Sequence, residues 1–491
     1  MIAVAQSSSR PVVALLLRQW IALLGLCAMA SYQIGTTTEV ARYSTIAVFC
    51  VTAVVGALLC RRLQMKLGDP ALQVTADLWM VKLVLTLFLM YYSWLPQLDP
   101  ESTGTWGYDP QRYYWQAQEL IDNNWIPDIT GLNYFGILYY YGAIMALLGR
   151  NPLVPAFVNC FVTLIAVLSL AQFCYEIRTR ATHRDWHIVL VLLFPELVWF
   201  DVLTSRETLV AALIVIFFTT AGRYLARTAP VRMGHVLLIC AVTVVIIAGV
   251  RTSMLLPLVA ALMLLIVFVR HARERRTFGP VVLAAAALVS IVFAPLIAGS
   301  IGGEDFSTVQ AVRTSTLTEE NAVAIDEGTW WAEDSIGRLF LPDNIVEAIL
   351  FVPPRFAMYL VAPWPNTGVS VGGLLGQSWD VWQRLMVSLS ALFNIVAMPY
   401  VLASAVQTVA NRKSASGALV LHISYWLVAF AVAGGNLIIQ ERYRVMASML
   451  LWACAWLGAT TVTKQLFIKT AAAWYGFLFA GGLFYLLYKG L

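Results

Sequence analysis

A polar and aromatic stretch, WGYDPQRYYWQAQELIDNNW, interrupts a strongly apolar chain at residues 106–125. Asp109 stands directly before Pro110, an order typical of a helix N-cap followed by the first helical residue. A capping aspartate needs no chemical role. Held at the tip of a surface helix beside the rings of Tyr108 and Tyr113, the same carboxylate could instead accept the proton of a sugar hydroxyl. The residues alone leave both interpretations open.

Arg112 follows Asp109 within one helical turn, and its positive charge favours the ionised form of a neighbouring carboxylate. A second charge pair, Arg206 and Glu207, follows in LTSRE, with Asp201 one to two turns upstream. These three residues fit either a functional charge group near the end of a span or a structural ion pair that closes a tight hairpin.

Four further arginines are candidate ligands for a phosphate. Arg251 lies between two apolar runs, where an arginine is costly unless it meets an anion or its side chain extends to the lipid headgroups. QERYR presents Arg442 and Arg444 beside Glu441, and guanidinium groups suit phosphate or pyrophosphate. Residues two apart on a helix diverge, so we expect only one of this pair to face a cavity. Arg355 in PPRF is the fourth candidate. For each, anchoring at the membrane interface is the alternative.

The composition shows which elements must position these residues. Hydrophobic residues make up 60% of the 491 residues and charged residues 12%, with a mean hydropathy of +0.75. These values predict an integral membrane protein. Apolar runs long enough to cross a bilayer lie near residues 12–31, 43–60, 74–95, 132–149, 154–174, 187–204, 208–226, 234–250, 252–270, 280–300, 381–405, 417–437, 445–462 and 470–488. We predict an all-α polytopic fold of about 12–14 transmembrane helices in a single domain spanning residues 1–491.

The basic loops predict an orientation. Clusters of arginine and lysine near residues 61–66, 178–184, 223–232, 270–276 and 412–413 are expected on the cytoplasmic side, as a net charge of +5 in short loops suggests. The opposite, outer side then receives two long polar loops with short amphipathic or interfacial segments, residues 96–130 and 301–380. Three apolar runs separate Arg62 from Arg178, and an odd number cannot return the chain to the same face. Either one run is tilted or re-entrant, or one cluster breaks the rule.

Several kinds of site find no support in the sequence. The five histidines are scattered and the seven cysteines lie in or beside apolar runs without metal-ligand spacing, so no zinc site is predicted. The phosphate-binding and dinucleotide-binding glycine motifs are missing, and no nucleic-acid partner is expected. No cofactor is predicted with certainty, and a divalent cation stays compatible with the acidic loops.

The order of these features resembles a bacterial multispanning glycosyltransferase of the GT-C superfamily, the group that includes lipid-linked-sugar-dependent protein mannosyltransferases and aminoarabinose transferases. The resemblance covers most of residues 100–460. It rests on YDPQRYYWQAQEL, NYFGILYYYGAIMALLGRNPLVPAFVNC, FPELVWFDVLTSRETLVAAL, APWP and ERYRVMASMLLWACAWLGA. It implies that Asp109 is the catalytic base of the first outer loop. Many members carry an Asp-Glu pair there, whereas Pro110 follows Asp109 here, so the resemblance does not extend to a metal-assisting pair of acids.

The resemblance and the residues together predict transfer of a sugar from a polyprenyl-phosphate lipid to a glycan or lipid acceptor. We expect the active site on the outer face of the plasma membrane. The transfer is expected to serve cell-envelope or exopolysaccharide assembly. Two alternatives stay open: a repeat-unit polymerase or ligase that uses a pyrophosphate-linked oligosaccharide, and a flippase or other transporter of lipid-linked oligosaccharides. Against a transporter, the spans show no internal repeat.

Overall fold

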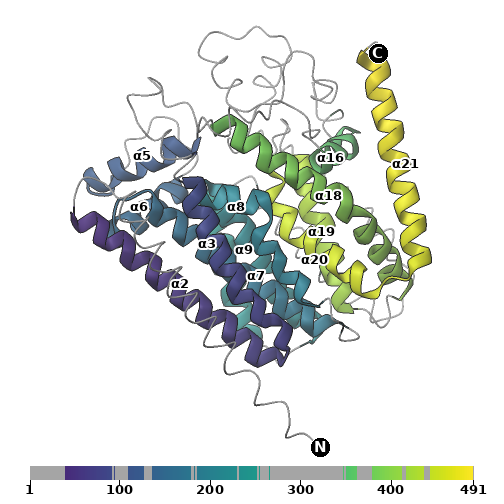
Figure 1. Cartoon of the computed structure of the whole chain (residues 1–491), viewed down its shortest axis with the longest axis horizontal. Coiled ribbons are helices and arrows are strands. Elements are labelled where there is room, and N and C mark those ends of the chain that lie inside the picture. The colour runs from purple at the N-terminus through teal and green to yellow at the C-terminus, as the bar shows by residue number, and fades with distance from the viewer. Residues whose placement is uncertain are drawn as a thin grey trace, which may run out of the picture.

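The structure is a computed structural model, and it describes residues 39–90, 93, 109–126, 135–178, 182, 185–228, 232–251, 254, 265, 347, 350–361, 379–411, 416–435 and 443–489 (Figure 1). Within these ranges every regular element is helical, which confirms the predicted all-α class. In the described part of the chain, seven helices are long and apolar enough to cross a membrane. They are α2 (Glu39–Leu67), α3 (Val74–Leu89, preceded by the 3-10 helix η1, Pro70–Gln73), α7 (Leu153–Ile177), α9 (Arg206–Ala226), α10 (Met233–Val250), α18 (Trp379–Ala410) and α21 (Lys464–Lys489).

The described residues also include three shorter apolar helices: α6 (Phe135–Leu148), α19 (Ser416–Gly435) and α20 (Val445–Thr461). Together these elements establish an all-α, membrane-embedded protein. The predicted runs 12–31 and 280–300 lie outside the described residues, as does nearly all of 252–270. The count of about 12–14 spans therefore stays a prediction.

The apolar run 187–204, expected as one span, consists of two short helices. A 3-10 helix, η4 (Asp185–Leu193), is followed by α8 (Pro195–Val202). Phe194 between them has an extended backbone, with φ −60° and ψ 124°. The cause is Pro195, because proline disfavours a helical conformation in the residue before it and cannot donate a backbone hydrogen bond.

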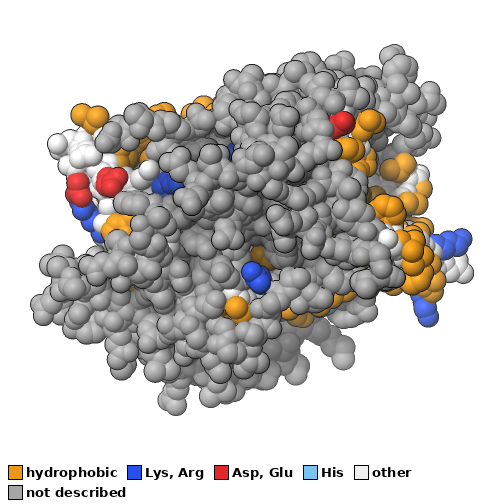
Figure 2. Space-filling model, turned by 90° about the horizontal axis from the view of Figure 1, so that it is seen from above, with side chains coloured by type: hydrophobic (Ala, Val, Ile, Leu, Met, Phe, Trp, Pro, Cys, Tyr) orange, Lys and Arg blue, Asp and Glu red, His pale blue; other side chains and the backbone are white. Residues whose placement is uncertain are grey.

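The helices pack around one large hydrophobic core. α7 packs against α9, α2 and η4, and α20 packs against α18, α19 and α9. α21 stands apart at the right of Figure 1 and meets α18 through two bonds: the Thr470 hydroxyl donates to the carbonyl of Pro399 at 3.2 Å, and the Trp474 indole donates to that of Ile395 at 3.0 Å. Hydrophobic side chains gather at this edge in Figure 2, as expected of a helix that faces lipid.

The two ends of the bundle differ in character. At one end, which we call the basic end, α2 finishes in exposed basic residues (Arg61, Arg62 and Lys66). Arg178 lies 3.7 Å from Asp69 there, and Arg223 lies 2.7 Å from Glu176. The first pair joins the end of α7 to the segment that follows α2. The second pair joins the last turns of α9 and α7. The opposite end, the α5 end, carries α5 (Asp109–Asp122) and the turn at residues 202–206.

Helix α6 lies across the α5 end. It has 14 residues, about 21 Å, and is shorter than the ~30 Å core of a bilayer. Near its start, Gly136 packs so closely that an added Cβ would lie 2.5 Å from the backbone of Gly249 at the end of α10. At its centre, the Tyr141 hydroxyl donates to the carbonyl of Ser205 in the 202–206 turn at 2.7 Å.

The end of α6 is at the α5 end as well, because Arg150, two residues beyond α6, pairs with Asp122 of α5 at 2.6 Å. Of the three apolar runs between Arg62 and Arg178, therefore, 74–95 and 154–174 run the length of the bundle through α3 and α7. The run 132–149 does not. This geometry accounts for the odd number of runs without an exception among the basic clusters.

Candidate functional site

Helix α5 begins at Asp109 and has one buried and one polar face. Tyr113, Ala117 and Leu120 are buried at helical spacing, while Glu119 and Asp122 are exposed. Acidic and basic side chains gather at the left edge of Figure 2, where α5 lies in Figure 1. The buried face fixes α5 against α6, and the exposed acidic residues lie in its last turns.

Two hydrogen bonds fix the first half of α5. At its start, the buried Thr204 hydroxyl donates to the carbonyl of Pro110. One turn later, the Tyr114 hydroxyl donates to the carbonyl of Arg150 at 2.8 Å. Burial raises the pKa of Tyr114 above its usual range, so this phenol stays protonated and can donate. The bond from Thr204 places the peptide that follows Pro110 beside the 202–206 turn.

A buried charge cluster lies just beyond this turn. Glu207 Oε1 is 3.3 Å from Arg251 Nη1 and 3.6 Å from Arg206 Nε. The guanidinium of Arg251 also lies 4.2 Å from the ring centroid of Tyr443, a cation–π distance. All four side chains are buried. Two guanidinium groups thus lie within 4 Å of one carboxylate.

Helix ends position each member of this cluster. α9 begins at Arg206, which puts Glu207 in its first turn, where the helix dipole favours a negative charge. α10 ends before Arg251, whose N–H donates to the carbonyl of Ile247 at 2.7 Å. Tyr443 lies just before α20. The predicted residues Arg206, Glu207 and Arg251 are thus brought together, although Asp201 is not part of the group.

Asp201 instead pairs with Lys82 of α3, and this corrects the grouping expected from LTSRE. Lys82 Nζ lies 2.5 Å from Asp201 Oδ2, and both side chains are fully buried. Thr163 donates to the other carboxylate oxygen at 2.8 Å. An intramembrane charge needs a partner, and the apolar run 74–95 contains Lys82 as its only basic residue. That lysine was the signal from which a buried acidic partner could have been predicted.

The structure gives Arg444 a structural partner in place of the phosphate that we expected. Its Nε donates to Glu196 Oε1 at 2.7 Å, and its Nη atoms donate to the carbonyls of Tyr359 and Val387 at 3.2 and 3.1 Å. Ser448 lies 3.4 Å from the other oxygen of Glu196. Arg444 is therefore part of a buried ion pair with Glu196, and its role as a phosphate ligand stays a prediction.

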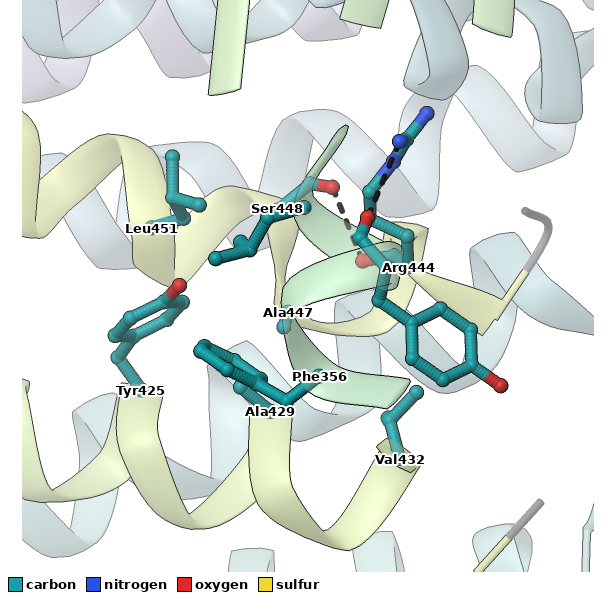
Figure 3. Close-up of a pocket in the computed structure, with 10 residues that line it drawn as sticks. Phe356, Tyr425, Ala429, Val432, Arg444, Ala447, Ser448 and Leu451 are labelled. Atoms are coloured by element: carbon teal, nitrogen blue, oxygen red, sulfur yellow. Dashed lines mark hydrogen bonds between the residues drawn. The ribbon is translucent and has the colours of Figure 1, made fainter. Parts of the chain in front are cut away.

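Arg444 also borders a small cavity between α16 (Val352–Val361), α19 and α20 (Figure 3). Phe356 of α16 and Tyr425 of α19 lie across it from Ser448 of α20. The space open to the centre of a water molecule is about 20 Å³, enough for a water molecule and far too small for a sugar. Arg355 of α16 is fully buried as well, and its Nε donates to the carbonyl of Phe351 at 3.3 Å. Both arginines therefore belong to the packing of this region.

The remaining predicted residues are only partly described. Tyr108, Glu441, Arg442 and the side chain of Asp109 lie outside the described part of the structure. Arg112 is half-buried in the first turn of α5. Sequence reasoning missed Tyr443, which stacks on Arg251, and Thr204, which joins α5 to the turn. Neither residue type carries a pattern that predicts such a contact.

Among the described residues, no group of three or more His, Cys, Asp or Glu is placed to hold a metal ion. In comparisons with known proteins, the chain matches no family model, no curated protein and no solved structure.

Proposed function

We propose that the protein is a membrane glycosyltransferase that moves a sugar from a polyprenyl-phosphate donor to a glycan or lipid acceptor. The observation that carries this proposal is the hydrogen bond from Thr204 to the carbonyl of Pro110. It holds Pro110, the residue that follows Asp109, beside the turn that leads to Arg206 and Glu207. The candidate base is thereby proposed to act at the same end of the bundle as Arg206 and Arg251.

The charges of this cluster suit a phosphate that leaves with a negative charge. Arg206 and Arg251 both lie within 4 Å of Glu207, and guanidinium groups form strong, charge-assisted hydrogen bonds with phosphate. They are buried, and electrostatic stabilisation is stronger where water is excluded. Arg442 is the proposed additional ligand because it directly precedes Tyr443, the residue that stacks on Arg251.

The reaction that fits these groups is a single displacement at the anomeric carbon. Asp109 accepts the proton of the acceptor hydroxyl, and the hydroxyl oxygen forms the new bond to the anomeric carbon. The bond from this carbon to the phosphate oxygen breaks, and the phosphate leaves with the electron pair, stabilised by the arginines. One displacement inverts the configuration of the sugar.

The proposed orientation places the α5 end on the outer side of the plasma membrane. The basic end carries Arg61, Arg62 and Lys66, and such residues are favoured on the cytoplasmic side. Nucleotide sugars are not expected on the outer side, which is why a lipid-borne donor is proposed.

A donor panel tests the function. Purified protein in lipid is given polyprenyl-phosphate sugars and, separately, pyrophosphate-linked oligosaccharides, and transfer to glycan and lipid acceptors is measured for wild type, Asp109→Asn and Arg251→Ala. We expect transfer from the monophosphate donors, with at least a hundredfold loss in Asp109→Asn. Transfer from the pyrophosphate donors alone would replace the proposal with a polymerase or ligase. No transfer from either class would refute the enzymatic function.

A further inference from the structure

The turn at residues 202–206 is held by side chains from three other helices. α8 ends at Val202 and α9 begins at Arg206, and Ser205, the N-cap of α9, makes no side-chain capping bond. The side chain of the N-cap residue therefore does not accept from the first N–H groups of α9. The hydrogen bonds that hold this segment are donated instead to its carbonyl groups.

Three carbonyl groups of this segment accept hydrogen bonds from α6 and α7. Asn159 Nδ2 donates to the carbonyl of Asp201 at 3.3 Å and to that of Leu203 at 2.9 Å. The Tyr141 hydroxyl donates to the carbonyl of Ser205 at 2.7 Å. Asn159 and Tyr141 also lie 3.1 Å apart, so the two donors fix each other. The carbonyls of residues 201, 203 and 205 thus each accept a hydrogen bond from Asn159 or Tyr141.

The Lys82–Asp201 pair fixes the beginning of the same segment. Besides its ion pair, Lys82 Nζ donates to the carbonyl of Leu192 at 3.0 Å, on the other side of the break at Phe194. One ammonium group therefore joins η4 to α8, and Thr163 secures the remaining oxygen of Asp201. A charge pair with no exposed surface has a large desolvation cost, and such a pair is retained where it specifies one geometry.

We propose that Lys82, Asp201, Asn159 and Tyr141 form a brace whose role is to position the first turn of α9. The brace sets where Arg206 and Glu207 lie relative to Arg251 and to the start of α5. These four are positioning residues, since none of them belongs to the charge cluster itself. The consequence for sugar transfer rests on the proposed function, whereas the consequence for the backbone of α9 does not.

Hydrogen–deuterium exchange of the full-length protein in lipid tests the brace directly. The variants are Tyr141→Phe, which removes a single hydroxyl, and Lys82→Met/Asp201→Asn, which removes both charges together. The expected result is at least tenfold faster exchange in peptides covering residues 203–210, with unchanged exchange at 223–228.

The matched control is Glu176→Gln, which breaks the pair with Arg223 at the other end of α9. It is expected to speed exchange at residues 223–228 and to leave 203–210 unchanged. Wild-type exchange at 203–210 in both brace variants would overturn the proposal. Equal acceleration at both ends of α9 would overturn it too, because it would show a general loss of stability.

Transfer kinetics add a second readout. With a polyprenyl-phosphate sugar donor, Tyr141→Phe is expected to lower kcat about tenfold while its melting temperature stays near that of wild type, since a small misplacement near reacting groups slows the chemistry. An unchanged kcat in a variant with accelerated local exchange would refute the role in positioning. If wild type transfers nothing, the proposed function fails, and the exchange experiment still decides whether the brace exists.

Discussion

Replacing Thr204 with valine isolates the contact that joins α5 to the 202–206 turn. Valine keeps the branched shape of the buried side chain and removes only the hydroxyl that donates to Pro110. One hydrogen bond contributes about 1 kcal/mol net. If that energy favours the docked position of the start of α5, its loss lowers the ratio of docked to undocked protein roughly fivefold, because 1.4 kcal/mol is a factor of ten.

The assay for Thr204→Val is the initial rate of sugar transfer from a polyprenyl-phosphate donor, measured together with the melting temperature. We expect a slower rate, with a loss of at most about fivefold, the factor that corresponds to one hydrogen bond. Thr204→Ser is the matched control, since serine retains the donor, and it should keep most of the wild-type rate. Equal rates in Thr204→Val and wild type would refute the argument that this bond positions Asp109. An equal loss in both variants would show that the methyl group matters and the hydroxyl does not.

Two predictions concern the packing that supports the site. Gly458→Ala would place a Cβ 2.2 Å from the carbonyl oxygen of Tyr400, so we expect a loss of about 1–3 kcal/mol, whereas Gly476→Ala has no atom within 4 Å of its new Cβ and should be neutral. Thermal unfolding in detergent measures both, and equal melting temperatures would contradict the α18–α20 contact. Glu196→Gln leaves the buried Arg444 without its carboxylate, and a loss of about 3–5 kcal/mol is expected. A wild-type melting temperature in this variant would contradict the structural role of the pair.

The sequence was sufficient for the fold class because hydrophobicity is a local property. Apolar runs of membrane length predicted α3, α7 and α9 within a few residues, and the all-α class follows from them. It was harder to predict which apolar runs are interrupted and which do not cross the bundle. Pro195 divides the run 187–204, and the run that becomes α6 has the composition of a span but packs across the end of the bundle.

The partners of charged residues could not be predicted, because each pairing joins distant parts of the chain. Arg444 meets Glu196 across 248 positions, and no periodicity or composition specifies that contact. Likewise, no sequence pattern specified Asp201 as the acid that pairs with Lys82. Where two candidates are adjacent, as with Arg206 and Glu207, sequence reasoning placed them together. Asp109 stays a candidate base on the strength of its position at the start of α5.

The most direct measurement is the single-turnover rate of sugar transfer in Asp109→Asn, compared with Asp122→Asn at the other end of the same helix. Both changes replace one carboxylate of α5 with an amide. Asp122 lies exposed beside Arg150, away from the 202–206 turn. We predict at least a hundredfold slower transfer in Asp109→Asn, as for the loss of a general base. Asp122→Asn should transfer at close to the wild-type rate. A wild-type rate in Asp109→Asn, or equal losses in the two variants, would contradict the proposed catalytic base.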